Sequence, residues 1–287
     1  MTVATRTPPD QRRLSTGMNV AVWPGDGPPI LALHGLTSTH HTWGKLASDL
    51  SARNVIAPDL RGRGASMQMG APYGLPNHAR DIVALVDEMG LRDIVLVGHS
   101  MGAFLAPMVA ARMQARVARM VLLDGGPPVG LPFYLIRPLV RMAFARQARE
   151  VGEPFGSVEE ALDGPAGAAV SGRPDVREVV AGWLEESAVP IEGGRAAAVD
   201  TAAMPVDGVS NFFDREVREA ARNLACPAGL LYAEWGARDG ARPFYTPRSA
   251  AELERKIAKL GTRQVTGTNH LTLLFAPEVP LAVAGKS

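Results

Sequence analysis

The residue best placed to do chemistry in this sequence is a serine between two glycines. Residues 98–102, Gly-His-Ser-Met-Gly, follow four apolar residues at 94–97 and precede a helical pattern that starts at Ala103 and runs to about Met113. This pattern predicts a strand, a sharp turn and a helix, with Ser100 at the turn. Glycines two positions before and after the serine remove the clash between strand and helix. Ser100 is therefore a candidate nucleophile, and the competing interpretation is a glycine-rich turn without chemistry.

A second loop can complete an oxyanion hole beside Ser100. The strand expected at 30–33 ends at residues 34–36, His-Gly-Leu. In a sheet of this kind, the loop after that strand offers a backbone N–H, here that of Leu36, toward the same point as the N–H of Met101. Four early histidines are expected to take no part in proton transfer: His34, which we expect to orient its loop, and His40, His41 and His99.

His270 is the candidate general base. It follows a short strand expected at 264–266 and precedes an apolar stretch at 271–275 that we expect to start the last helix. A late histidine on a strand-to-helix loop can reach the serine while its other ring nitrogen meets an acid. The alternative, a histidine hydrogen-bonded within the core, would be preferred if the serine turn were absent.

Strands and helices alternate along the first part of the chain, after a hairpin arm that leads to a Pro-Gly-Asp-Gly turn. Such alternation predicts a parallel sheet with helices on both faces and a ligand site at the carboxyl ends of the strands. The glycine-rich run at 59–66 lacks the spacing of a phosphate-binding loop, so we expect a tight turn there. The expected elements are the arm at 14–23, strands at 30–33, 54–58, 94–97 and 120–123, and helices at 42–50 and 81–89.

Four motifs, taken in order, resemble those of the α/β-hydrolase fold family. The resemblance covers roughly residues 18–126 and 224–275 and is specific to the fold and the nucleophile type, not to a substrate. It implies an α/β fold with a mostly parallel central sheet, helices on both faces and a helical lid inserted after the sixth core strand. It also implies a serine hydrolase that works through an acyl-enzyme. The motifs are His34-Gly35-Leu36, Asp59-Leu60-Arg61-Gly62-Arg63-Gly64-Ala65-Ser66, Gly98-His99-Ser100-Met101-Gly102 and Asn269-His270.

The acid that would orient His270 stays open among three carboxylates. In the family it usually follows the strand after the lid, here 227–233, where Asp239 lies late and Glu234 lies early. It can also stand at the end of the preceding core strand, where Asp124 is followed by two glycines. We prefer Asp124 over Asp239, although an aspartate at such a strand end can simply bond the N–H groups of its own turn.

The resemblance and the pattern together divide the chain. We expect a flexible N-terminal lead at 1–13, a core at 14–126 and 224–287, and a helical lid at 127–223. In the lid, Pro-Pro and Gly-Pro pairs separate short helical stretches with no strand-like run between them. No arginine pair in it stands out as a carboxylate clamp. The lid helices are expected at 133–149, 158–162, 176–186 and 215–222. Its apolar residues are expected to pack on the core and partly line a cavity above Ser100; they include Phe133, Tyr134, Leu135, Phe144, Trp183, Phe212 and Phe213.

Composition narrows the class of protein. The chain has 287 residues, of which 46% are hydrophobic and 21% are charged, enough to bury a sizeable core. A formal net charge of +1 gives no support for a nucleic-acid partner. No apolar run approaches a membrane span, and the polar first residues lack a signal-peptide pattern, so a cytoplasmic location is expected. The single cysteine, Cys226, cannot form an internal disulfide, and no His or Cys spacing indicates a metal; we expect no cofactor.

The sequence thus predicts hydrolysis of a carboxylic ester or lactone of a mainly apolar small molecule. Two alternatives stay open. The same residues could cleave another bond, such as a thioester, an amide or a carbon–carbon bond beside a ketone. The chain could also be a ligand-binding or partner-binding protein with a weak or lost triad. Epoxide and haloalkane hydrolysis are less expected, since similar folds use an aspartate where this chain has Ser100.

Overall fold

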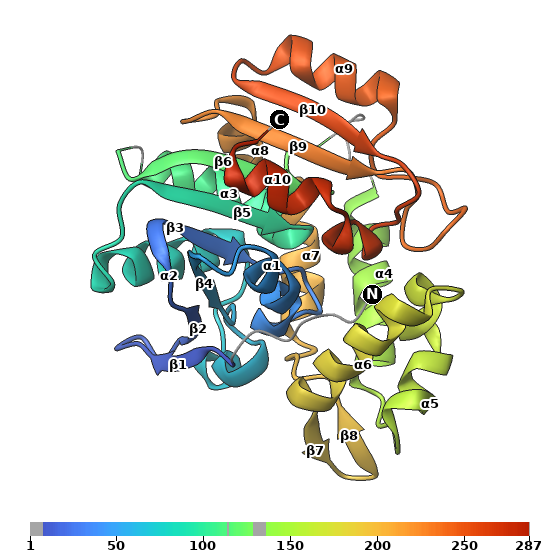
Figure 1. Cartoon of the computed structure of the whole chain (residues 1–287). Helices are drawn as coiled ribbons and strands as arrows, with labels where there is room; N and C mark the ends of the chain where they lie inside the picture. Colours follow the sequence, from blue (N-terminus) through green and yellow to red (C-terminus); the bar gives the residue numbers. More distant parts are fainter. Residues whose placement is uncertain (1–7, 114, 129–135, 287) are drawn as a thin grey trace.

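An eight-stranded sheet forms the centre of the molecule (Figure 1). The computed structural model describes residues 8–113, 115–128 and 136–286. The strands of this sheet are β1 (Asp10–Arg13), β2 (Asn19–Trp23), β3 (Asp26–Leu33), β4 (Arg53–Pro58), β5 (Ile94–His99), β6 (Val117–Leu123), β9 (Ala228–Ala233) and β10 (Leu260–Val265). In space their order is β1-β2-β4-β3-β5-β6-β9-β10. β2 pairs antiparallel with β1 and β4, and the remaining neighbours are parallel.

Helices cover both faces of the sheet (Figure 1). The apolar core on one face includes side chains of α2 (Leu75–Glu88), α3 (Met101–Arg112), α8 (Arg215–Arg222) and α9 (Pro247–Lys256). The core on the other face includes side chains of α1 (Gly44–Asp49) and α10 (Glu278–Ala284). The parallel sheet expected from the alternation of elements is confirmed. None of the helices in the described residues has the length and the apolar run needed to cross a membrane.

Alternate residues of each central strand enter opposite cores. In β3, Leu31 and Leu33 belong to the core with α2 and α3, whereas Ile30 and Ala32 belong to the core with α1 and α10. This follows from the period of two along a strand. Because both faces are covered, the strand is a continuous apolar run in sequence, and its carboxyl end is held in a fixed position.

A long segment between β6 and β9 carries the inserted helices. It contains α4 (Arg137–Gly152), α5 (Val158–Asp163), the 3₁₀ helix η4 (Pro165–Val170), α6 (Pro174–Ser187), α7 (Ala203–Phe213) and α8. Figure 1 shows α5 and α6 grouped at one side of the molecule, away from β1 to β5 in the sheet. Helix α4 packs along α7, where the Phe144 ring lies against Gly208. Trp183 stacks on Phe275 with ring centroids 5.4 Å apart, so the inserted segment also packs against the C-terminal part of the chain.

The N-terminal region differs from the expectation of a flexible lead at 1–13. Asp10–Arg13 form the edge strand β1, which pairs with Asn19–Trp23. All four residues of β1 are exposed, so the strand carries no apolar pattern. It is held by backbone pairing with β2 and by side-chain hydrogen bonds, such as those from Asn19 Nδ2 to Gln11 Oε1 at 2.9 Å and from Arg13 Nη1 to Ala65 O at 3.1 Å. The arm at 14–23 does not form a hairpin across the turn at 24–27. Its strand β2 pairs with β1 and β4, whereas β3, which follows the turn, lies on the other side of β4.

The inserted segment also differs from the expectation in two ways. A small antiparallel sheet, β7 (Val189–Ile191) and β8 (Gly194–Ala196), lies where no strand was expected. Helix α7 was not expected, because Pro205 stands in its first turn and Gly208 in its middle. The helix expected at 133–149 is described from Arg137 onward, and Phe133, Tyr134 and Leu135 lie outside the described residues.

Candidate active site

Ser100 occupies a strained turn between β5 and α3. Its backbone has φ 52° and ψ −117°, in the left-handed half of the map that a residue with a side chain rarely adopts. The two glycines make this turn possible: a Cβ at Gly98 would lie 2.3 Å from Gly102 O, and one at Gly102 would lie 2.1 Å from Leu33 O. The strand, turn and helix predicted around Ser100 are confirmed.

His270 and Asp124 lie in hydrogen-bond contact. His270 Nδ1 is 2.6 Å from Asp124 Oδ2, and Asp124 is only 2% exposed. The Asp124 backbone has φ 46° directly after β6, and its N–H donates to Leu231 O. The second carboxylate oxygen, Oδ1, accepts the N–H of Ala233 at 3.2 Å. One carboxylate thus bonds both the neighbouring strand and the histidine, so anchoring the turn and orienting His270 are not exclusive alternatives.

The other two carboxylates have different partners. Asp239 Oδ1 accepts a hydrogen bond from Asn269 Nδ2 at 2.7 Å, and Oδ2 pairs with Arg173 Nη2 at 2.9 Å. Glu234 Oε2 accepts the backbone N–H of Gly267 at 2.7 Å. The structure therefore brings Asp124, and neither of these two residues, to the imidazole of His270.

The loop at 34–36 lies against the serine turn. A Cβ atom at Gly35 would stand 3.3 Å from His99 Nδ1 and 3.4 Å from Ser100 Cβ, so the two loops are in direct contact at this glycine. His34 fixes this loop from inside the core: its Nδ1 is 2.8 Å from Gly35 O, and its Nε2 accepts the N–H of Leu60 at 2.9 Å. Because a carbonyl only accepts and an N–H only donates, His34 is neutral with its proton on Nδ1. Complete burial lowers the pKa of His34 to about 4, which keeps it in this form.

This arrangement sets the direction of one backbone N–H. The Gly35 carbonyl and the Leu36 N–H belong to the same planar peptide, so a bond that fixes the first also fixes the second. The N–H of Ser38 also donates to Gly35 O, at 3.3 Å. On the other side of Leu36, its carbonyl accepts a hydrogen bond from Arg63 Nε at 3.0 Å. Both peptides around Leu36 are thus held by hydrogen bonds.

Arg63 is a functional candidate that sequence reasoning did not single out. Its side chain is completely buried, and besides Leu36 O it donates to Arg61 O at 2.9 Å and forms an ion pair with Asp207 of α7. The visible signal was an arginine between two glycines in the run at 59–66, which we interpreted as a tight turn and as a motif of the fold family, with no role given to Arg63 itself. Burial alone would raise the pKa of Asp207, but His78 and Arg63 lower it to about 2.

Two rings flank His270. His99 Nε2 is 2.9 Å from His270 O, and the two imidazoles lie with centroids 4.7 Å apart. Burial, followed by the proximity of His270, lowers the pKa of His99 to about 3, so its neutral ring donates from Nε2. Phe244 lies with its centroid 5.0 Å from the His270 ring and is 48% exposed. His99 therefore supports the backbone of His270, and Phe244 offers an apolar surface beside it.

Metal-ligating side chains do not gather at this site. Within residues 8–113, 115–128 and 136–286, no group of three or more His, Cys, Asp or Glu side chains is arranged to hold a metal ion. The chemistry available to the described residues is that of a serine, a histidine oriented by a buried carboxylate, and backbone N–H groups.

Comparison with known proteins points to one fold. Residues 28–182 match the profile of a family described as alpha/beta hydrolase fold. A non-heme haloperoxidase of Rhodococcus erythropolis is 40% identical over 108 residues, which are 37% of this chain and 39% of that protein. Lipase LipV of Mycobacterium tuberculosis is 37% identical over 111 residues, 39% of this chain and 41% of that protein. The chain thus spans about two fifths of the length of these two curated relatives.

Other similar proteins cover nearly the whole chain at lower identity. An N-formylmaleamate deformylase of Pseudomonas putida is 28% identical over 253 residues, 86% of this chain and 83% of that protein. The crystal structure of E-2-(acetamidomethylene)succinate hydrolase superposes with a TM-score of 0.78 at 24% identity, covering 96% of this chain and 97% of that one. The enol-lactonase from Burkholderia xenovorans superposes with a TM-score of 0.68 at 18% identity, covering 96% and 98%. Because both identities are below 25%, the similarity to these two solved structures shows a shared fold and nothing more.

Proposed function

This chain belongs to the alpha/beta hydrolase fold family, and on that premise we propose that it is a serine hydrolase that cleaves a carboxylic ester or lactone through an acyl-enzyme. The observation that carries the proposal is the 2.6 Å contact between His270 Nδ1 and Asp124 Oδ2. The His270 ring also lies against the ring of His99, the residue directly before Ser100 in the chain. A buried carboxylate that holds one imidazole nitrogen leaves the other free to take a proton from a serine.

The proposed reaction uses these groups in two stages. His270 Nε2 removes the proton of Ser100 Oγ as that oxygen attacks the carbonyl carbon, and His270 then gives the proton to the departing alkoxide. Asp124 keeps the other proton of the imidazole on Nδ1 and stabilises the positive charge that the ring acquires. In the second stage, His270 takes a proton from water as the water oxygen attacks the acyl carbon. The bond from the acyl carbon to Ser100 Oγ then breaks, His270 returns the proton to that oxygen, and the acid product leaves.

The negative charge on the carbonyl oxygen would be stabilised by the backbone N–H groups of Leu36 and Met101. Met101 starts α3, so its N–H is free of helical partners and lies at the positive end of the helix. The N–H of Leu36 is fixed by the bonds that His34 and Arg63 make to the two adjacent carbonyls. Donors held in place before the reaction need no reorganisation when the charge develops.

We further propose that the segment at 127–223 serves as a lid over Ser100. Its packing supports this role: Phe212 of α7 lies edge-on to Phe104 of α3, with ring centroids 5.2 Å apart, one turn of helix after Ser100. Together with Phe244 beside His270, these rings favour a substrate whose body is mainly apolar.

A second candidate is cleavage of an amide. It is favoured by the deformylase of Pseudomonas putida, whose name gives an N-formyl group as the group removed and whose aligned region covers 83% of that protein. The same serine, histidine and aspartate serve both reactions, but the leaving nitrogen must be protonated by His270 before it departs.

The test is a hydrolysis panel of aryl esters, alkyl esters, lactones, N-formyl and N-acetyl amides and thioesters. Wild type is compared with Ser100→Ala, and circular dichroism verifies that both are folded. Turnover that vanishes with Ser100→Ala supports the serine mechanism, and the preferred bond separates ester from amide cleavage. Equal turnover by both proteins, or none on any member, would contradict the proposal and favour a binding function.

A further inference from the structure

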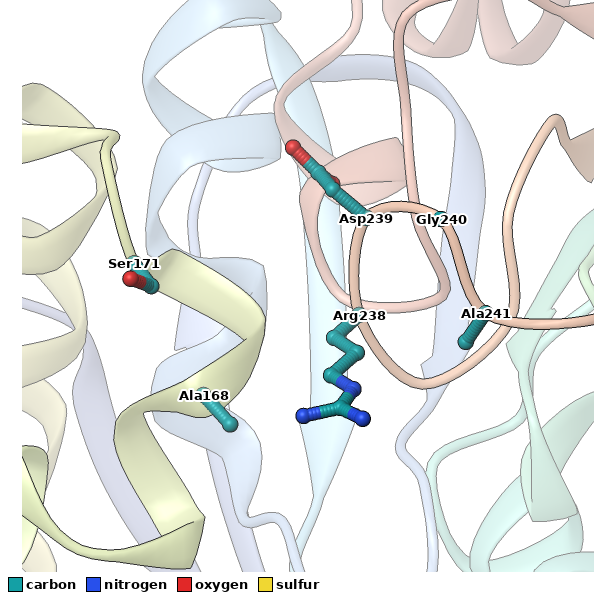
Figure 2. A pocket seen from close by; sticks show the side chains of 6 residues that line it. All are labelled: Ala168, Ser171, Arg238, Asp239, Gly240 and Ala241. Atoms are coloured by element: carbon teal, nitrogen blue, oxygen red, sulfur yellow. The ribbon is translucent and has the colours of Figure 1, made fainter.

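A pocket of about 470 Å³ lies between the inserted helices and the loop after β9 (Figure 2). One wall is formed by Ala168 of η4 and Ser171 just after it, and the other by residues 238–241. Figure 2 shows the Arg238 side chain reaching from the loop toward η4, whereas Asp239 points away from Arg238. Small side chains on both walls leave this space open to a ligand.

The pocket adjoins the loop that carries His270. Asn269, which is completely buried, donates from Nδ2 to Asp239 Oδ1 at 2.7 Å and to Ala169 O at 2.8 Å, so one side chain ties the two walls together. The N–H of His270 donates to Gly236 O at 2.9 Å, just before the pocket loop. A group bound between these walls is therefore held by the same loops that hold His270.

The two charged side chains of the pocket, Arg238 and Asp239, differ in whether they have an ion-pair partner. Asp239 is neutralised by Arg173, whose guanidinium also donates to Gly267 O at 2.7 Å. Arg238, by contrast, forms no ion pair with any of the described residues, although its guanidinium lies in the pocket. Arg238 is therefore a cation of this pocket that is available to a ligand, and a planar guanidinium binds a carboxylate with two parallel hydrogen bonds.

We propose that this pocket binds a carboxylate group of the substrate, with Arg238 as the recognising cation. The inference rests on the proposed hydrolase function and makes it more specific: the preferred substrate has an acyl group that ends in a carboxylate. The exposed ring of Phe244, beside His270, offers an apolar surface to the middle of such a molecule, and Arg238 selects its charged end. Arg238 lies outside the lid. Within the lid, the sequence had shown no arginine pair that could clamp a carboxylate.

The experiment compares two esters of equal length that differ only at one end. Mono-4-nitrophenyl glutarate ends in a carboxylate, and 4-nitrophenyl pentanoate ends in a methyl group. We expect Arg238→Gln to raise KM for the glutarate ester about tenfold or more, as for the loss of a charged hydrogen bond, and to change KM for the pentanoate ester less than twofold. Arg238→Lys should keep part of the preference. Arg92→Gln is the matched control, since Arg92 precedes β5 at the opposite end of the strands.

A binding measurement separates this inference from the proposed function. Calorimetric titration of free glutarate into Ser100→Ala, with and without Arg238→Gln, needs no turnover. Binding that is lost with Arg238→Gln supports the pocket even if no ester is hydrolysed. The inference would be overturned if the two esters had equal KM values in wild type and again in Arg238→Gln, or if Arg238→Gln left glutarate binding unchanged. Either result would leave ester hydrolysis through Ser100 intact.

Discussion

Arg63 and Asp207 are separated by 144 positions in the sequence, and they form an ion pair in which neither side chain has any exposed surface. The pair joins the loop after β4 to helix α7 of the inserted segment. Asp207 also accepts the N–H of Gly74 at 2.6 Å and lies 3.1 Å from His78 Nε2. A buried carboxylate with several donors is strongly stabilised in its charged form, so loss of one partner leaves an uncompensated charge.

We therefore expect Asp207→Ala to destabilise the protein by about 3–5 kcal/mol, as measured by urea unfolding. The double variant Arg63→Met with Asp207→Leu removes both charges and should recover much of this loss. It should still have a low kcat, because a methionine side chain in place of the guanidinium donates nothing to the Leu36 carbonyl. A double variant with wild-type kcat would show that Arg63 acts only through stability.

The acid is tested by two matched substitutions. Asp124→Asn should lower kcat by about 10⁴-fold, because an amide no longer holds the required tautomer of His270 or stabilises its charge. The matched substitution Asp239→Asn makes the same change, with the shape of the side chain kept, at a carboxylate that bonds Asn269 and Arg173 instead of His270. It should lower kcat less than tenfold. Steady-state kinetics on the best ester decide the question; the reverse order of effects would assign the acid to Asp239.

His34 is expected to act through the oxyanion donor that it aligns. His34→Ala removes the bond that fixes the Gly35–Leu36 peptide, and we expect a decrease in kcat of about 10–100-fold with little change in KM. This decrease in kcat should be no larger than the decrease caused by complete loss of one oxyanion-hole donor. His41→Ala is the control, since His41 pairs with Glu186 of α6. A change in KM without a change in kcat would place His34 in substrate binding instead.

Stability should also depend on pH through the buried histidines. The folded pKa of His34 is about 4 and that of His99 is about 3, both below the ordinary value of 6.5. Below pH 6.5 the unfolded chain therefore binds more protons than the folded one, and the free energy of unfolding falls as pH falls. His34 alone accounts for a loss of up to about 3 kcal/mol between pH 6.5 and 4.

Urea unfolding at several pH values between 7 and 4 checks this dependence. The slope of stability against pH should be smaller in His34→Ala than in wild type, because one of the groups that titrates differently in the two states is gone. Identical slopes would mean that His34 is not held neutral in the folded protein. Asp59 and Asp207 contribute mainly below this range. Burial alone would raise both pKa values, but neighbouring His40 for the first and His78 for the second lower each to about 2, so most of their stabilisation is lost between the unfolded value of 3.8 and about 2.

The sequence predicted the parts of the fold whose pattern is local. The strand before Ser100 and the helix after it were identified because an apolar run leads into a serine with a glycine two positions before it and another two positions after it. The edge strand at Asp10–Arg13 was not, since its four exposed polar residues are held by backbone pairing and by side-chain bonds to other segments, neither of which leaves a local pattern. Helix α7 was missed because Pro205 and Gly208 locally disfavour a helix. Packing of Gly208 against Phe144, which is distant in the sequence, stabilises the helix there.

The candidate site was predictable in part for the same reason. Ser100 and His270 stand in recognisable local contexts, whereas the choice among Asp124, Asp239 and Glu234 depends on which carboxylate the folded chain brings to the imidazole. The contacts of Arg63 join distant segments, and the pocket that Arg238 lines forms only where two distant segments meet. No sequence pattern marks an arginine whose partner lies on another element.

Strand β10 lies at the edge of the sheet and pairs only with β9 there, and His270 follows it. Ser100, Leu36 and Asp124 follow central strands that have neighbours on both sides. An edge strand opens more readily than a central one, because it breaks fewer hydrogen bonds in doing so. Transient fraying of β10 would thus carry His270 away from the residues that follow the central strands, so we expect hydrolytic activity to fall on mild warming or in dilute denaturant before the sheet melts.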